Sequence, residues 1–126
     1  MLEFFEEYTA ALTEEERQTL LPLMVRSLKQ HVGRENAVTN KRMREGLEAW
    51  GYKVSDARIR KLINHIRRYS RVECLMATGK GYYVTEDVAE LEQYLKSLEK
   101  RAKAISEVKR QISSQLENLK RKQGLS

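Results

Sequence analysis

The chain has 126 residues, a charged fraction of 33 %, a net charge of +6 and a single proline. This profile favours one helix-rich globular domain and argues against a disordered or collagen-like chain. The longest apolar run, residues 20–25, falls far short of the ~20 residues of a membrane span. The acidic N-terminus differs from a signal peptide, and the single cysteine is typical of a reducing compartment. We therefore expect a cytoplasmic protein, associated with the nucleoid if it is bacterial or phage-borne.

The positive charge is concentrated in the middle third of the chain. Residues 1–30 carry a net charge of −3, residues 31–71 carry +7, residues 72–85 are neutral and residues 86–126 carry +2. A charge asymmetry of this kind indicates a polyanionic partner.

The N-terminal third predicts two helical segments. Residues 1–12 are expected to form a short helix or arm, because one helical stripe contains Leu2, Phe5, Tyr8 and Leu12. Thr13 and Glu16 have the spacing of a capping box, which predicts a second helix ending near Val32. The acidic triplet that contains Glu16 is interpreted as a solvated helix start. Pro22 must kink this helix or begin a new one.

Two capped helices joined by a short turn follow. Thr39 is the expected N-cap of a helix over residues 40–50, and Gly51 is its expected stop. The apolar stripe of this helix, which includes a tryptophan expected to anchor the core, is Met43, Leu47 and Trp50. Ser55 is the expected N-cap of the next helix, over residues 56–69. Its apolar stripe is Ile59, Leu62, Ile63 and Ile66.

After these helices the periodicity becomes that of strands. Residues 72–77 and 81–85 are short runs rich in β-branched and aromatic residues, and they flank a glycine-containing turn with Lys80 at its tip. The pattern predicts a β-hairpin. We expect Cys74 to be a small core residue, and one of the two tyrosines of the second run to pack on the core.

The C-terminal segment, residues 86–122, reads as one long helix without glycine or proline. Its apolar residues recur at alternating steps of four and three, which is typical of a left-handed coiled coil, with Lys109 in one apolar slot. Packing back onto its own domain is the alternative, but a domain of about 80 residues is too small to cover the whole seam. We expect a homodimer or a partner helix at this seam: Leu91, Leu95, Leu98, Ala102, Ile105, Ile112, Leu116 and Leu119.

This order of elements resembles that of a winged helix-turn-helix domain. The resemblance is carried by Thr39–Gly51 as support helix, the turn GYKV, Ser55–Tyr69 as recognition helix and the hairpin CLMATGKGYYVT as wing. The whole chain is also similar to small winged-helix proteins of phages and prophages, regulatory or replication-organiser-like.

The resemblance implies a mainly α fold with a small β-hairpin. It divides the chain into an N-terminal arm (1–12), a winged helix domain (13–85) and a long C-terminal coiled-coil-like helix (86–126). It further implies sequence-dependent binding of double-stranded DNA as a dimer, in transcription regulation or phage-type replication. The spacing from Gly51 to Ile59 departs from the tightest helix-turn-helix pattern, which leaves open which residues reach bases.

The residues themselves support a DNA surface. The outer face of the helix over residues 56–69 is cationic, and no acid follows Asp56 on that helix. A major groove accepts a helix of this width, arginine suits guanine edges, and Asn64 suits adenine. Cations of the preceding helix and the hairpin would hold phosphates. The expected DNA-binding residues are Ala57, Arg58, Arg60, Lys61, Asn64, Arg67, Arg68, Arg71, Lys80, Lys41, Arg42 and Arg44.

Other functions remain as alternatives or find no support. The basic helix face can instead be merely solvated, and the chain can instead be a protein–protein adaptor that uses the C-terminal helix and the basic surface. His31 and His65 lack companions at ligand spacing, so we expect no metal site. No phosphate loop, catalytic triad or paired carboxylate is recognisable, so we expect neither a cofactor nor an enzyme.

Overall fold

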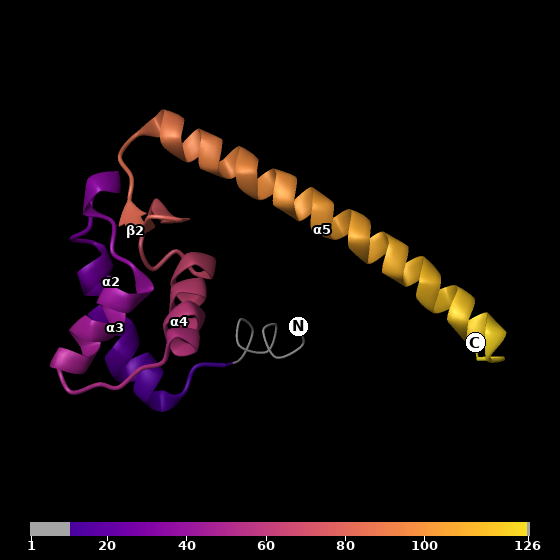
Figure 1. The fold of residues 1–126 in the computed structure, drawn as a ribbon, viewed down its shortest axis with the longest axis horizontal. Coiled ribbons are helices and arrows are strands. Elements are labelled where there is room, and N and C mark those ends of the chain that lie inside the picture. The colour runs from indigo at the N-terminus through magenta and orange to yellow at the C-terminus, as the bar shows by residue number, and fades with distance from the viewer. Residues whose placement is uncertain (1–10, 126) are drawn as a thin grey trace. The chain divides into compact units, whose positions relative to one another are not determined.

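The computed structural model describes residues 11–125 (Figure 1). The predicted class is confirmed, because the described part is mainly helical with one small antiparallel hairpin and a long C-terminal helix. The chain divides after Val88 into two compact units. The predicted stripe Leu2, Phe5 and Tyr8 lies outside the described residues. The elements are η1 (Glu16–Leu20), α2 (Leu21–Leu28), η2 (Arg34–Asn36), α3 (Asn40–Ala49), α4 (Asp56–Arg68), β1 (Leu75–Thr78), β2 (Gly81–Val84) and α5 (Val88–Lys122).

The first helical segment begins at the predicted capping box. The Thr13 hydroxyl accepts the Glu16 N–H at 3.2 Å, and a Glu16 carboxylate oxygen accepts the Thr13 N–H at 2.8 Å. The segment widens into the π-helical turn η1 directly before Pro22, whose ring nitrogen carries no hydrogen and cannot continue the helical ladder. It ends at Leu28, so the prediction of a helix to Val32 is wrong.

Val32 and Val38 instead pair with the hairpin. Val32 forms a parallel bridge with Val84, and Val38 forms an antiparallel bridge with Tyr82. The Val38 N–H donates to the Tyr82 carbonyl at 2.9 Å, and the Tyr82 N–H returns a bond of 2.8 Å. These bonds satisfy backbone groups of β2 that would otherwise form an open sheet edge.

The two predicted N-caps are confirmed. The Thr39 hydroxyl accepts the Arg42 N–H, and the Ser55 hydroxyl accepts the Arg58 N–H, each at 3.2 Å. Gly51 has φ +92°, the left-handed conformation that ends many helices. The expectation that Trp50 anchors the core is wrong: α3 ends at Ala49, and the Trp50 side chain beyond it is 77 % exposed.

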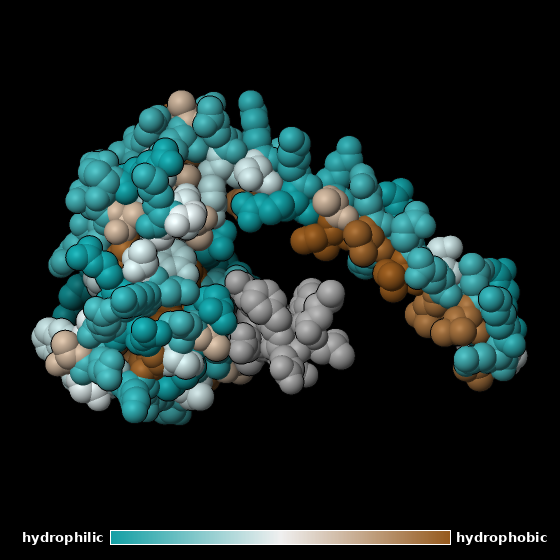
Figure 2. Space-filling view, in the orientation of Figure 1, coloured by the Kyte–Doolittle hydropathy of each residue, from teal (hydrophilic) through white to brown (hydrophobic). Residues whose placement is uncertain are grey.

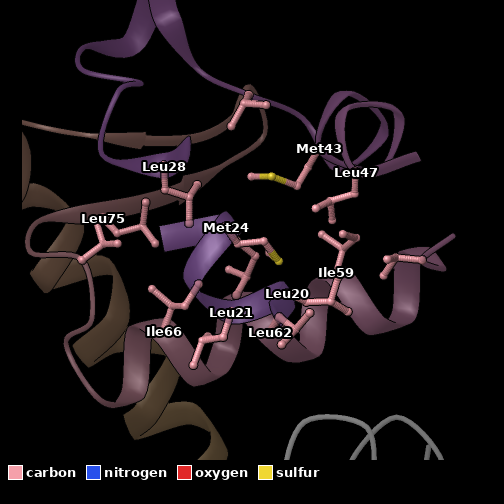
Figure 3. Close-up of a cluster of buried hydrophobic side chains, with 14 residues drawn as sticks. Leu20, Leu21, Met24, Leu28, Met43, Leu47, Ile59, Leu62, Ile66 and Leu75 are labelled. Atoms are coloured by element: carbon pink, nitrogen blue, oxygen red, sulfur yellow. The ribbon is translucent and has the colours of Figure 1, made fainter. Parts of the chain in front are cut away.

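The core of the first unit lies between α2, α3 and α4 (Figure 3). All four apolar residues predicted for α4 are buried, and Ile59, Leu62 and Ile66 lie on the side of α4 that faces α2. Each such side chain contributes roughly 1.5–3 kcal/mol when it leaves water. This burial fixes the rotation of α4 about its axis and therefore the direction of its remaining side chains. The core residues are Leu20, Leu21, Met24, Leu28, Val38, Met43, Leu47, Val54, Ile59, Leu62, Ile63, Ile66, Val72 and Leu75.

The hairpin pairs β1 with β2 in antiparallel register, from Leu75 opposite Val84 to Thr78 opposite Gly81. Gly81 has φ +120°, and a Cβ on it would lie 2.5 Å from the Val38 carbonyl oxygen, so this position needs glycine. One of the two tyrosines packs on the core as predicted: Tyr82 is half-buried against the core cluster, and Tyr83 is buried outside that cluster.

The prediction that Cys74 is a core residue of the first strand is wrong. Cys74 is exposed, precedes β1 and has φ +58°. The chain turns through this residue before Leu75 begins the strand, so the thiol lies outside the strand in which Leu75 and Met76 are both buried.

The second unit consists of α5 and the few residues after it. At 1.5 Å per residue its 35 residues extend about 52 Å, and none of them is buried. Hydrophobic side chains gather in a stripe along the helix (Figure 2). Within residues 11–125, no helix combines the length and hydrophobicity that a membrane crossing needs. Of the seam residues, Leu91 and Leu98 are half-buried, and the others are exposed: Leu95, Ala102, Ile105, Ile112, Leu116 and Leu119.

Candidate nucleic-acid interface

The predicted DNA-binding residues differ in how far they reach solvent. One group is exposed: Lys41, Arg42, Arg68, Arg71 and Lys80. The other group is half-buried: Arg44, Ala57, Arg58, Arg60, Lys61, Asn64 and Arg67. Most of them lie on α4, opposite or beside its buried stripe, while Lys80 lies in the turn between β1 and β2.

Two cations of α4 bind a buried acid from the start of the chain's first helical segment. Lys61 Nζ lies 2.8 Å from Glu16 Oε1, and Arg58 Nε lies 3.2 Å from Glu16 Oε2. Arg58 Nη2 also lies 3.6 Å from the Glu15 carboxylate. The Glu16 side chain is 1 % exposed and that of Lys61 14 %. The interpretation of Glu16 as part of a solvated helix start is therefore wrong.

The protonation state of Glu16 follows from these contacts. Burial alone raises the pKa of Glu16, but hydrogen bonds from Lys61, the Thr13 N–H and Arg58 outweigh it and lower the pKa from 4.5 to about 2. The carboxylate is thus ionised at neutral pH, and its charge is compensated within the unit. Arg58 and Lys61 accordingly have a structural role in holding α4 against the first helical segment, whether or not they also contact DNA.

A second ion pair joins α3 to α4. Arg44 Nη1 lies 2.7 Å from Asp56 Oδ1, and both side chains are partly exposed. Exposed pairs of this type contribute about 0–1 kcal/mol, so this one mainly orients Arg44 and balances its charge. Asp56, which complements the dipole at the start of α4, therefore also reduces the positive field near Arg44.

The C-terminal end of α4 has a different electrostatic environment. Arg68 and Arg71 are exposed, and within residues 11–125 neither forms an ion pair with a carboxylate. The Arg68 guanidinium lies 5.5 Å from the centre of the Tyr69 ring, which also lies 4.6 Å from the His65 ring. Burial, and then the charges of Arg71 and Arg68, lower the pKa of His65. This end of the helix therefore has a net positive field.

The remaining predicted cations flank α4 from other elements. Lys41 and Arg42 lie in the first turn of α3, and Lys80 is exposed at the hairpin turn, where its N–H donates to the Thr78 hydroxyl at 3.2 Å. Arg60, Asn64 and Arg67 on α4 are all half-buried and engaged in interactions.

No family model, curated protein or solved structure matches this chain. The interface is therefore interpreted from its own residues.

A pocket between α2 and α3 was not predicted from the sequence. It has a volume of about 460 Å³, and the exposed Trp50 lies at its edge. Its lining combines apolar side chains such as Leu23 and Leu47 with the cations Arg26 and Arg42. The one sequence signal for this pocket is Trp50, which directly precedes the glycine that ends α3. At that position helical spacing no longer determines where the tryptophan side chain points.

Chemically, the described part of the first unit offers cations and hydrogen-bonding groups. In the described part of the chain, no three His, Cys, Asp or Glu residues lie close enough together to hold a metal ion. What the arrangement does provide is an oriented helix with exposed arginines at one end and a lysine-tipped hairpin after it. Such a surface suits a polyanion.

Proposed function

We propose that this protein binds double-stranded DNA through a winged helix domain formed by residues 13–85. In this proposal α3 is the support helix, α4 is the recognition helix and the β1–β2 hairpin is the wing. The bridges from Val32 and Val38 to β2 support the assignment, because they attach the hairpin to the helical core. The biological role follows as recruitment or occlusion at DNA, in transcription regulation or phage-type replication.

The observation that carries the proposal is the difference between the two ends of α4. Near its start, acids compensate Arg58, Lys61 and Arg44. At its C-terminal end, Arg68 and Arg71 are exposed without an acidic partner in the described residues. Adjacent uncompensated cations repel one another, and binding phosphates would convert that repulsion into attraction with release of counterions.

The contacts then divide into two classes. Arg68, Arg71 and Lys80 would neutralise phosphates, which sets position and affinity but not sequence. Arg60, Asn64 and Arg67 are the candidates for base edges, because arginine pairs with guanine and asparagine with adenine in the major groove. Ala57 leaves room for close approach at the start of the helix.

Salt dependence tests the proposal. Affinity for random duplex DNA should fall with added salt, with a log–log slope of several units. Arg68→Ala and Arg71→Ala should each weaken binding to all duplexes alike and reduce the slope by about one. Fluorescence anisotropy with labelled duplexes at four or more salt concentrations measures both quantities.

Lys103→Ala is the matched control, because it removes an exposed cation from α5, outside the first unit. It should leave slope and affinity near those of the parent. A flat salt response of the parent would overturn the DNA proposal. An unchanged slope in both arginine variants would overturn the assignment to α4.

A protein–protein adaptor is the second candidate, favoured by the exposed apolar stripe of α5 and by the Trp50-edged pocket. If the protein is an adaptor, its affinity for DNA should not exceed its affinity for a peptide or protein polyanion of equal charge. Competition of labelled duplex with polyglutamate separates the two functions.

A further inference from the structure

The positions along α5 form a heptad whose core slots are known from the sequence. Taking Leu91 as d makes Leu95, Ala102, Lys109 and Leu116 the a residues. The other d residues are Leu98, Ile105, Ile112 and Leu119. Most of this seam is exposed, with Ile105 at 67 %, and no residue of α5 is buried. A seam of this regularity needs a partner helix that presents matching layers.

We propose that the partner is α5 of a second copy, bound in antiparallel orientation. The two ends of α5 differ in charge. Residues 86–92 hold four acids and no cation, and Lys120, Arg121 and Lys122 form the last turn. An antiparallel pair places each acidic end beside the basic end of the other copy, and it opposes the two helix dipoles.

Lys109 favours the same orientation. In a parallel pair the a residues face each other, so the two Lys109 ammonium groups would share one core layer. In an antiparallel pair a residues face d residues, and Lys109 of one copy lies opposite Leu98 of the other. The two Lys109 residues are then separated by 11 positions, about 16 Å along the axis, which exceeds the screening length of about 10 Å at 0.1 M salt.

The seam aligns from Leu91 to Leu116 in that orientation. The two-fold axis of the dimer generates each core layer twice. The four distinct layers pair Leu91 with Leu116, Leu95 with Ile112, Leu98 with Lys109 and Ala102 with Ile105. The flanking e positions then include Glu92 and Lys120, which are oppositely charged. Parallel pairing would join g and e positions five residues apart, and none of those pairs within α5 combines opposite charges.

The orientation of the two helices determines how far apart the dimer holds its two first units. Each first unit joins its own α5 at the N-terminal end, and in the aligned antiparallel pair the two Ala89 residues lie about 44 Å apart along the axis. A parallel pair would bring them to within the 8–10 Å of two packed helices. Bridging rests on the proposed DNA binding of the first unit. With that binding, the antiparallel rod carries one DNA-binding unit at each end and bridges two separate duplex segments.

Disulfide trapping tests the orientation independently of DNA. In a Cys74→Ser background, tagged chains with Leu91→Cys are mixed with untagged chains with Leu116→Cys, exchanged and oxidised. We expect cross-linked heterodimers in large excess over either homodimer, because Leu91 lies opposite Leu116 only in the antiparallel pair. Predominant homodimers, or a monomeric mass by sedimentation equilibrium, would overturn the proposal.

Two variants sharpen this result. Mixing Leu116→Cys with Lys100→Cys, an outward position of the heptad, should give no efficient cross-link. Lys109→Leu should weaken the orientation preference, because only the charged ends of α5 and the helix dipoles still favour it, so that homodimers cross-linked at position 91 now form beside the heterodimer. If Lys109→Leu leaves the heterodimer as dominant as before, Lys109 does not determine the orientation.

Bridging is tested with bead-bound duplex and a second, labelled duplex. The full chain should retain the second duplex on the beads, and Ile105→Glu, which places a charge opposite Ala102 and breaks the seam, should abolish retention while still binding the first. DNA binding without capture would overturn bridging alone. Loss of all DNA binding would overturn the proposed function and leave the cross-linking result unaffected.

Discussion

The helices α4 and α5 have similar sequence character and opposite environments. Both are amphipathic and rich in cations, but the apolar stripe of α4 is buried, whereas no residue of α5 is. The stripe of α4 meets side chains from α2 and α3 within its own unit. Amphipathicity therefore predicts that a helix needs a partner, and only the rest of the fold decides whether that partner lies in the same chain.

The two helices also compensate their charges differently. Glu16, which balances both Arg58 and Lys61 on α4, lies 42 and 45 positions away from them in sequence, in the first helical segment. On α5 the signs are interspersed along the helix itself, as between Glu117 and Lys120 at 3.8 Å. Acids from a distant segment can thus compensate a cationic helix face that has no acids of its own.

Truncating one isoleucine on each helix should separate the two environments, with the largest effect on α4. Ile66→Ala should lower the free energy of unfolding of the first unit by about 2–5 kcal/mol, because it removes buried methyl groups and leaves a cavity. Ile112→Ala should leave that free energy unchanged and instead weaken association through α5. Urea unfolding of the first unit and sedimentation equilibrium measure the two effects.

Ile66→Val covers the case in which the alanine variant does not fold, with an expected loss of about 0.5–1.5 kcal/mol. The comparison between the helices would break if Ile112→Ala destabilised the first unit as much as Ile66→Ala does. It would break equally if Ile112→Ala left the mass distribution of a dimeric parent unchanged at every concentration.

Glu16→Gln should have the next largest effect. It keeps the size and capping geometry of the side chain but removes the charge that Lys61 and Arg58 bind. We expect a loss of about 1–3 kcal/mol in the free energy of unfolding, since hydrogen bonds to a buried charged group are lost or weakened. Glu14→Gln, at an exposed position of the same turn, is the matched control and should change stability little.

The contribution of Glu16 to the free energy of unfolding should also depend on pH, in a direction that its pKa determines. The pKa of Glu16 is lowered from 4.5 to about 2 in the folded protein, so the unfolded chain binds the proton more readily. The stabilisation is therefore present above pH 4.5 and is lost as the pH falls toward 2, by at most about 3 kcal/mol. Urea titrations between pH 6 and 2 should show this loss in the parent, and an equal slope in Glu16→Gln would contradict it.

Much of this fold could be predicted because its signals are local. The capping hydroxyls of Thr39 and Ser55 act on N–H groups three residues away, and the α4 stripe follows from helical spacing alone. The glycine-containing turn likewise marked the hairpin.

The errors have longer-range causes. Trp50 lies one residue beyond α3, where helical spacing no longer predicts direction, and Cys74 lies in a turn of positive φ before β1. The contact of Glu16 with α4 joins segments that no spacing rule relates. The only sequence feature that pointed to it was the net charge of −3 over residues 1–30, which is opposite in sign to that of residues 31–71. The assignment of individual α4 side chains to bases stays a prediction.

The smallest expected effect distinguishes the two ends of α4 at a single titrating group. Burial, then the charges of Arg71 and Arg68, lower the pKa of His65 from 6.5. Phosphates bound by these arginines would offset their charge, so the pKa of His65 should rise when duplex DNA is added. NMR titration of the His65 ring resonances, assigned with His65→Gln, follows this pKa with and without DNA. In Arg68→Ala the free protein should already titrate at higher pH and the DNA-induced change should shrink. An unaltered His65 pKa at saturating DNA would place the bound phosphates away from the C-terminal end of α4.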